Sequence, residues 1–259
     1  MGGSSVLAAT ILMSVGTLLG LNLTKEDLVY LVSQVEQVLT TGGGWQDQVG
    51  AIYGGFKIAR SPKLLPLRVS VSPATVQENL IEAFEKRTFL LYTGQQRLAK
   101  NTLINALRKC ALIPANDPNN TVAALIQGAE KGFQLITDTT FSDSDDALDA
   151  LAAILNDYWT LKKEMAAGSE PPHIKKLLGS LRPFAEGLSL CGAGAGGFAV
   201  IILKREASLA DLEALVRHLN GDISSQDSLS VHTIKVDRSG IKTSRYNDSE
   251  KDVLFYLKD

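Results

Sequence analysis

Apolar residues recur at helical spacing in the first part of the chain. Between residues 28 and 39, Leu and Val stand three or four positions apart, which predicts an amphipathic helix. Thr24 and Asp27 precede this stretch with the spacing of a capping box, so the helix is expected to begin directly after Thr24. Glu36 falls off the apolar stripe, and by position alone it is a solvated charge on the helix face.

Residues 6–19 are apolar on every side of a helix, which predicts a helix buried all round, capped by Ser4 or Ser5 and ended by Gly20. The stretch is short for a membrane span and lacks a basic segment before it and a clear cleavage site. We therefore expect neither a signal peptide nor a membrane role.

The rest of the chain alternates between strand and helix patterns. Apolar runs predict strands at residues 67–71, 88–93, 198–203 and 231–236, with one more after residue 237. Helical spacing and caps predict helices at residues 98–108, 122–135 and 142–165, from Pro171-Pro172 onward, and from Ser208 to Leu219. The longest of these is expected to begin with a Ser142/Asp145 capping box, and the last with a Ser208/Asp211 capping box. This order favours an α/β (α+β) fold built as an open sandwich.

Breaks in the pattern divide the chain into two predicted domains. Gly54-Gly55, Ser61-Pro62 and Leu65-Pro66 interrupt the periodicity, so we expect one domain at residues 1–62 and a second at residues 63–259.

Composition and charge exclude several classes of partner. Lys and Arg number 26 against 28 Asp and Glu, a formal net charge of −2, so no basic field attracts nucleic acid or an anionic membrane. Cys110 and Cys191 lie far apart and near no histidine cluster, which is typical of reduced thiols in the cytoplasm.

A glycine run carries the first candidate chemistry. Gly42, Gly43 and Gly44 allow close approach of a ligand to the backbone, and they lead to Asp47, a carboxylate between two glutamines. Glu36 lies eleven residues upstream, so one carboxylate could hold a metal ion while the other handles a proton. A plain turn explains the same residues.

Four longer motifs follow one another along the chain. The first is the run from Thr40 to Gly50, TTGGGWQDQVG. The others are LLYTG at 90–94 with RLAKN at 97–101, YWTLKKEM at 158–165, and LSLCGAGAGGF at 188–198. In this order they resemble the motifs of the L-fucose kinases, a branch of the GHMP family of small-molecule kinases. The resemblance covers roughly residues 2 to 240 and implies the two-domain fold of these kinases.

The resemblance also implies an activity and a site. In the family, ATP phosphorylates the anomeric hydroxyl of the sugar, here L-fucose, with Mg²⁺ as the metal. The position of Asp47 matches the catalytic carboxylate and that of Glu36 a magnesium ligand. Further implied contacts to ATP and Mg²⁺ come from two loops: Gly2, Gly3, Ser4 and Ser5, with Ser5 also toward the metal, and Gly192, Gly194, Gly196 and Gly197. Without the family, the first loop is a helix cap, the second a tight hairpin, and Tyr158 and Trp159 are core residues.

Two departures from the family pattern open alternatives. The chain begins inside the phosphate-loop motif, so the first strands of the N-terminal domain are expected to be absent. We therefore expect weak ATP binding and low activity, with an uncovered apolar face on the helix at 6–19 that favours self-association or an upstream domain. A catalytically incompetent fragment serving as an interaction module, and a kinase for another sugar such as a heptose, remain open. Ala195 replaces a glycine of the family loop, which is unfavourable if that position needs a positive φ.

Overall fold

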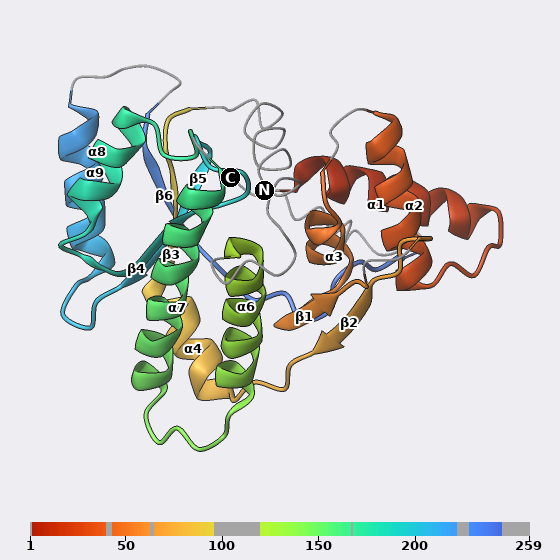
Figure 1. Cartoon of the computed structure of the whole chain (residues 1–259), viewed down its shortest axis with the longest axis horizontal. Helices are drawn as coiled ribbons and strands as arrows, with labels where there is room; N and C mark the ends of the chain where they lie inside the picture. The colour runs from red at the N-terminus through yellow and green to blue at the C-terminus, as the bar shows by residue number, and fades with distance from the viewer. Residues whose placement is uncertain are drawn as a thin grey trace, which may run out of the picture.

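The computed structural model describes residues 2–39, 43–62, 65–95, 120–166, 168–221 and 228–244 (Figure 1). The helices are α1 (Gly3–Leu18), α2 (Lys25–Val38), α3 (Gln46–Ile52), α4 (Glu78–Arg87), α6 (Thr121–Thr137), α7 (Ser144–Met165), α8 (Pro172–Leu181) and α9 (Leu209–Asn220). The strands are β1 (Lys57–Arg60), β2 (Ser70–Pro73), β3 (Thr88–Tyr92), β4 (Ala185–Leu190), β5 (Phe198–Leu203) and β6 (Ser230–Thr233). This mixture of helices and sheets confirms the predicted α/β fold class.

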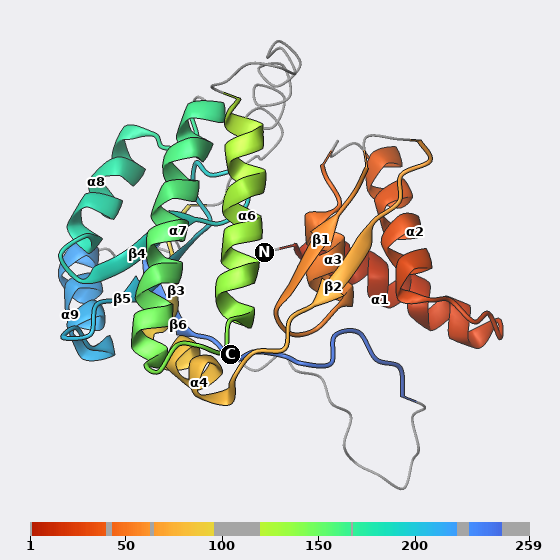
Figure 2. The ribbon, with the colours of Figure 1, turned by 60° about the horizontal axis from the view of Figure 1, so that its bottom comes forward.

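The first three helices pack on one another beside a small sheet. Strands β1 and β2 pair antiparallel, from Lys57 opposite Pro73 to Arg60 opposite Ser70. Figure 2 shows this pair lying against α1, α2 and α3. The core between them is built from Ala9, Leu28, Val29, Val32, Val49 and Ile52. The Thr24/Asp27 capping box forms as predicted and starts α2.

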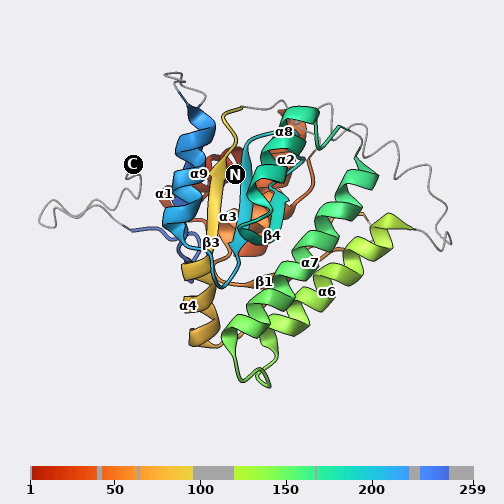
Figure 3. The ribbon, with the colours of Figure 1, turned by 90° about the vertical axis from the view of Figure 1, so that its left-hand side faces the viewer.

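A four-stranded antiparallel sheet forms the larger part of the molecule, with the strand order β4-β5-β3-β6. Side chains of β5 alternate between its two faces. Ile201 belongs to a core that includes α8 and α9, whereas Ile202 packs with Leu80 of α4 and Ala152 of α7. Helices therefore cover both faces, an arrangement that can be followed in Figure 3.

Several predicted element boundaries differ from the structure. The side chain of Asp143, rather than Ser142, caps α7, because its carboxylate accepts the N–H of Asp145. The strand predicted at 67–71 lies at Ser70–Pro73, and the one predicted at 231–236 ends at Thr233. No strand occurs in the described residues 237–244. The helix predicted at 98–108 lies outside the described residues.

The chain after β6 returns to the N-terminal helices. The N–H of Gly55 donates to the carbonyl oxygen of Asp237 at 2.6 Å, and the N–H of Ile241 donates to that of Ile52 at 3.1 Å. Figure 2 shows this late segment running beside β1 and β2. The predicted domain boundary at residue 62 falls between β1 and β2, which pair with each other, and it stays a prediction.

Helix α1 is not buried all round, contrary to the prediction from its apolar pattern, and it has the uncovered apolar face that the resemblance led us to expect. Ala9 is buried against α2 and α3, and Gly16 is buried against Leu23, but the opposite side carries large exposed apolar side chains. These are Val6, Leu7, Ile11, Val15 and Leu18, the last of them 85% exposed. The uniform apolar pattern could not distinguish the covered side from the open one, because a helix that is apolar all round has no preferred face. No helix in the described part of the chain is long and apolar enough to cross a membrane.

Candidate active site

The start of α1 is built differently from the serine cap that the sequence suggested. The N-cap residue is Gly2, which adopts a left-handed conformation with φ 59°, and no side chain caps the helix. Ser4 and Ser5 instead lie inside the helix and donate their hydroxyls to Oε1 of Glu36, at 3.0 and 2.7 Å. The prediction of a serine cap is therefore wrong, because a buried carboxylate from α2 takes up these hydroxyls.

The side chain of Glu36 on α2 connects this helix to α1 and α3 by hydrogen bonds. It is 8% exposed, so its reading as a solvated charge is also wrong. Besides the two serines of α1, Nε2 of Gln48 on α3 donates to its Oε2 at 2.7 Å. Each of these hydrogen bonds offsets part of the cost of burying the carboxylate. Gln48 is 1% exposed, and its Oε1 receives no hydrogen bond from the described residues.

Asp47 lies beside the N-terminus of α1. It occupies the first turn of α3 and is exposed. A Cβ atom placed on Gly2 would lie 3.4 Å from Cβ and 3.5 Å from Cγ of Asp47, so the carboxylate group packs directly against the helix start. Residue 2 favours glycine because of its positive φ, whereas a Cβ there would make only an ordinary van der Waals contact with Asp47. The structure brings Asp47, 45 residues away in sequence, next to the predicted phosphate loop.

The second glycine-rich loop joins β4 to β5. Gly192, Gly196 and Gly197 have φ values of 60°, 141° and 79° and line a cavity shared with Asp47. Gly194, with φ 86°, does not line it. A Cβ on Gly194 would lie 2.7 Å from both Cβ and O of Ser169, so this residue packs against the turn after α7. Its predicted contact with the ligand is therefore not supported by its place in the loop.

Ala195 occupies a left-handed position, with φ 65°. Its N–H donates to the carbonyl oxygen of Ser169 at 2.6 Å, which holds the residue in this conformation. In this left-handed conformation, a residue other than glycine is destabilised by roughly 1–2 kcal/mol. Glycine avoids this strain, but it loses more conformational entropy on folding, so the net gain from a glycine is smaller. The sequence predicted backbone strain at Ala195 if this position had a positive φ, and the structure shows that it does.

We expect Ala195→Gly to raise the free energy of unfolding by about 1 kcal/mol, measured by urea denaturation. Ala193 in the same loop has no positive φ, so Ala193→Gly is the matched control and should lower the free energy of unfolding by about 0.5–1 kcal/mol. Shifts of the same sign in the two variants would contradict the assignment of strain to Ala195.

The two loops face one cavity of about 1160 Å³. Its lining includes Gly2, Gly3, Ser4 and Asp47 on one side and Cys191, Gly192, Gly196 and Gly197 on the other. Ser5 and Glu36 do not line it and lie buried behind Ser4. The cavity wall also contains Tyr92, Gln95, Leu155 and Tyr158, which the sequence did not assign to a site. Only the LLYTG and YWTLKKEM motifs pointed to Tyr92 and Tyr158.

Tyr158 and Trp159 have different environments, although the sequence read both as core. Trp159 is 1% exposed, whereas Tyr158 is 40% exposed and lines the cavity. Burial of the phenol raises the pKa of Tyr158 above its ordinary value, and the Cys191 thiol adds to the shift. Tyr158 is therefore a neutral hydrogen-bond donor near pH 7.

The oxygen donors around Glu36 fit a magnesium ion. Mg²⁺ is usually held by one or two carboxylates together with phosphate oxygens and water, and hydroxyl oxygens suit it equally as hard ligands. Glu36 and the hydroxyl of Ser5 supply such donors directly behind the cavity. Within the described residues no group of three His, Cys, Asp or Glu side chains forms a complete metal site, so the substrate would have to supply the remaining ligands.

Comparisons with known proteins relate this arrangement to kinases. Residues 1–55 match the family model of the GHMP kinases N terminal domain. The chain is 30% identical over 224 residues to a bifunctional fucokinase/GDP-fucose pyrophosphorylase of Arabidopsis thaliana, covering 86% of this chain and 20% of that protein. It is 27% identical over 213 residues to an L-fucokinase/L-fucose-1-P guanylyltransferase of Bacteroides fragilis, covering 79% and 21%. The chain thus spans about a fifth of the length of these relatives.

The fold is also similar to solved structures. A Campylobacter jejuni protein described as a sugar kinase superimposes with a TM-score of 0.64 at 22% sequence identity, covering 93% of this chain and 64% of that one. At this identity the likeness establishes the fold alone.

Proposed function

We propose that the chain transfers the γ-phosphoryl group of ATP to the anomeric hydroxyl of L-fucose. The premise is that the chain is a fucokinase-like GHMP kinase in sequence and fold. The products are L-fucose 1-phosphate and ADP. The position of Asp47 against the N-terminus of α1, at a cavity bounded by two glycine-rich loops, carries this proposal.

The first helix offers a binding site for phosphate. The first N–H groups of a helix have no partner within it, and the helix dipole adds positive potential at the same end. In α1 these groups belong to Gly3, Ser4 and Ser5, and the first two residues line the cavity. Phosphate oxygens of ATP would accept these hydrogen bonds, and the glycine loop at 191–197 would bound the phosphates from the opposite side.

Phosphoryl transfer requires the protein mainly to position the reactants and to neutralise charge. The anomeric oxygen forms a bond to the γ-phosphorus while the bond from this phosphorus to the β–γ bridging oxygen breaks, and ADP leaves. We assign to Asp47 the role of orienting the hydroxyl and accepting its proton. Ser5 and Glu36 would hold Mg²⁺, which when bound neutralises charge on the phosphate oxygens. We place the reaction in the cytoplasm, where ATP is available.

A second candidate function is an interaction module without catalysis. The observation that favours it is the exposed apolar side of α1, where Leu7, Ile11 and Leu18 are more than half exposed. A face of this kind is typical of a surface that another domain or a second copy covers.

The two candidates differ in their expected turnover. The purified chain is mixed with MgATP and a panel of L-fucose, D-galactose, D-mannose and a heptose, and ADP formation is followed. We expect slow ADP formation that depends on L-fucose and is weaker still with the other sugars. Equal ADP formation with and without sugar would contradict a sugar kinase, and a preference for the heptose would contradict the assignment to fucose. A folded circular-dichroism spectrum with no turnover would favour the interaction module.

A further inference from the structure

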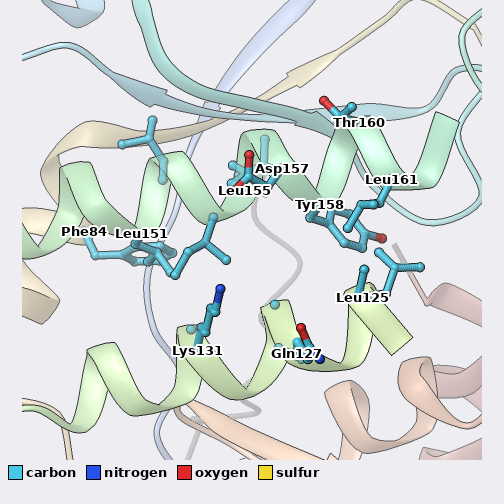
Figure 4. Close-up of a pocket in the computed structure, with 17 residues that line it drawn as sticks. Phe84, Leu125, Gln127, Lys131, Leu151, Leu155, Asp157, Tyr158, Thr160 and Leu161 are labelled. Atoms are coloured by element: carbon cyan, nitrogen blue, oxygen red, sulfur yellow. The ribbon is translucent and has the colours of Figure 1, made fainter. Parts of the chain in front are cut away.

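A second cavity, of about 720 Å³, lies between α6, α7 and the sheet (Figure 4). Most of its wall is apolar. The wall includes Phe84 of α4, Leu125 of α6, Leu151, Ile154 and Leu155 of α7, and Val200 and Ile202 of β5. Its volume lies within the range of roughly 300–1,000 Å³ that is usual for small-molecule sites. It contains none of the residues assigned above to ATP, magnesium or proton transfer.

The cavity exists because the face of α6 toward α7 carries small residues. Ala124, Gly128 and Gly132 are four residues apart and therefore share one face of α6. A Cβ on Gly132 would lie 3.9 Å from Cγ2 of Ile154, so the helices are in contact there. A Cβ on Gly128 would meet nothing within 4 Å, so the space opens one turn further along. A larger side chain at residue 128 would fill it.

A lysine brings a positive charge to the cavity. Figure 4 shows the side chain of Lys131 pointing from α6 into the space between the two helices, with its ammonium group near the apolar side chains of α7. Lys131 forms no ion pair within the described residues. Asp157 and Thr160 belong to the lining too, and Figure 4 shows their side chains pointing away from Lys131.

We propose that this cavity binds a small amphiphilic anion, an apolar ring or short acyl chain that ends in a carboxylate. The apolar wall would bury the ring or chain, and the ammonium of Lys131 would pair with the carboxylate at the rim. The proposal does not depend on the kinase reaction. The two sites are nevertheless adjacent, because Leu155, Tyr158 and Val200 line both cavities.

Binding of 2-naphthoate to the full chain tests the proposal, with the neutral 2-naphthalenemethanol as the comparison ligand and isothermal titration calorimetry as the measurement. We expect the carboxylate to bind ~5-fold more tightly than the alcohol, the size of a partly exposed ion pair. Lys131→Gln should remove this preference while leaving the alcohol unaffected. Gly128→Leu should abolish binding of both.

Two variants on α8 serve as matched controls. Gly179→Leu repeats the enlargement at a helical glycine whose Cβ would also meet nothing within 4 Å, and Lys175→Gln repeats the loss of an exposed charge. Both should bind 2-naphthoate as the unchanged protein does. Undetectable binding to the unchanged protein, or binding that Gly128→Leu and Lys131→Gln leave intact, would overturn the proposal. Circular dichroism verifies folding, and Lys131→Gln keeps the test decisive if Gly128→Leu does not fold.

Discussion

We expect Asp47→Asn to lower the proposed L-fucose-dependent ADP formation by ~10²–10⁴-fold, the usual contribution of a positioned acid–base group. The amide keeps the shape of the carboxylate and can still accept a hydrogen bond, but it cannot take the proton of the sugar hydroxyl. Asp47 is exposed and forms no part of a buried network, so the free energy of unfolding should change by no more than ~0.5 kcal/mol. The measurements are steady-state kinetics and urea denaturation of the two proteins.

The control for Asp47→Asn is Glu186→Gln, which removes one exposed carboxylate on β4 outside the cavity. It should leave turnover unchanged. Affinity for MgATP should stay within a few-fold in Asp47→Asn, because the proposed phosphate contacts are backbone N–H groups of α1. Turnover near that of the unchanged protein would remove Asp47 from the proposed mechanism without affecting the assignment of the fold.

We expect Trp159→Ala to lower the free energy of unfolding by about 3–5 kcal/mol, the usual cost of truncating a buried tryptophan. Trp159 is 1% exposed at the end of α7, within the core that joins α8, α9 and the sheet. Its Nε1 donates to Oε1 of Glu170 at 3.2 Å, next to Ser169, which holds the glycine-rich loop through Ala195. The truncation therefore leaves a void and loosens the turn that supports the candidate site.

Trp159→Phe separates packing from hydrogen bonding. It keeps an aromatic ring but loses the bond to Glu170, so it should cost clearly less than the alanine variant. Thr160→Ala, at the exposed neighbouring position, should change the free energy of unfolding by less than ~0.5 kcal/mol. All three are measured by urea denaturation followed by circular dichroism. A cost below ~1 kcal/mol for Trp159→Ala would show that this core tolerates the void, contrary to its close packing.

The sequence by itself determined the elements whose signals are local. The Thr24/Asp27 and Ser208/Asp211 capping boxes both form, because a side chain and a backbone group three residues apart decide them. Strand β5 was predicted with its observed bounds, since a short apolar run between glycines and a turn has few alternatives. The ordered motifs likewise indicated the kinase family before any geometry was known.

Tertiary structure decided what depends on partners distant in the chain. Ser4 and Ser5 had the pattern of a helix cap, and Glu36 that of a solvated charge, until α1 and α2 packed together and joined them by hydrogen bonds. Gln48 joins the same carboxylate from α3. A buried polar group without a hydrogen-bond partner is costly, so the buried carboxylate of Glu36 takes the serine hydroxyls that would otherwise cap α1. Helical periodicity records which side of its own helix a residue occupies, but not which helix will lie opposite.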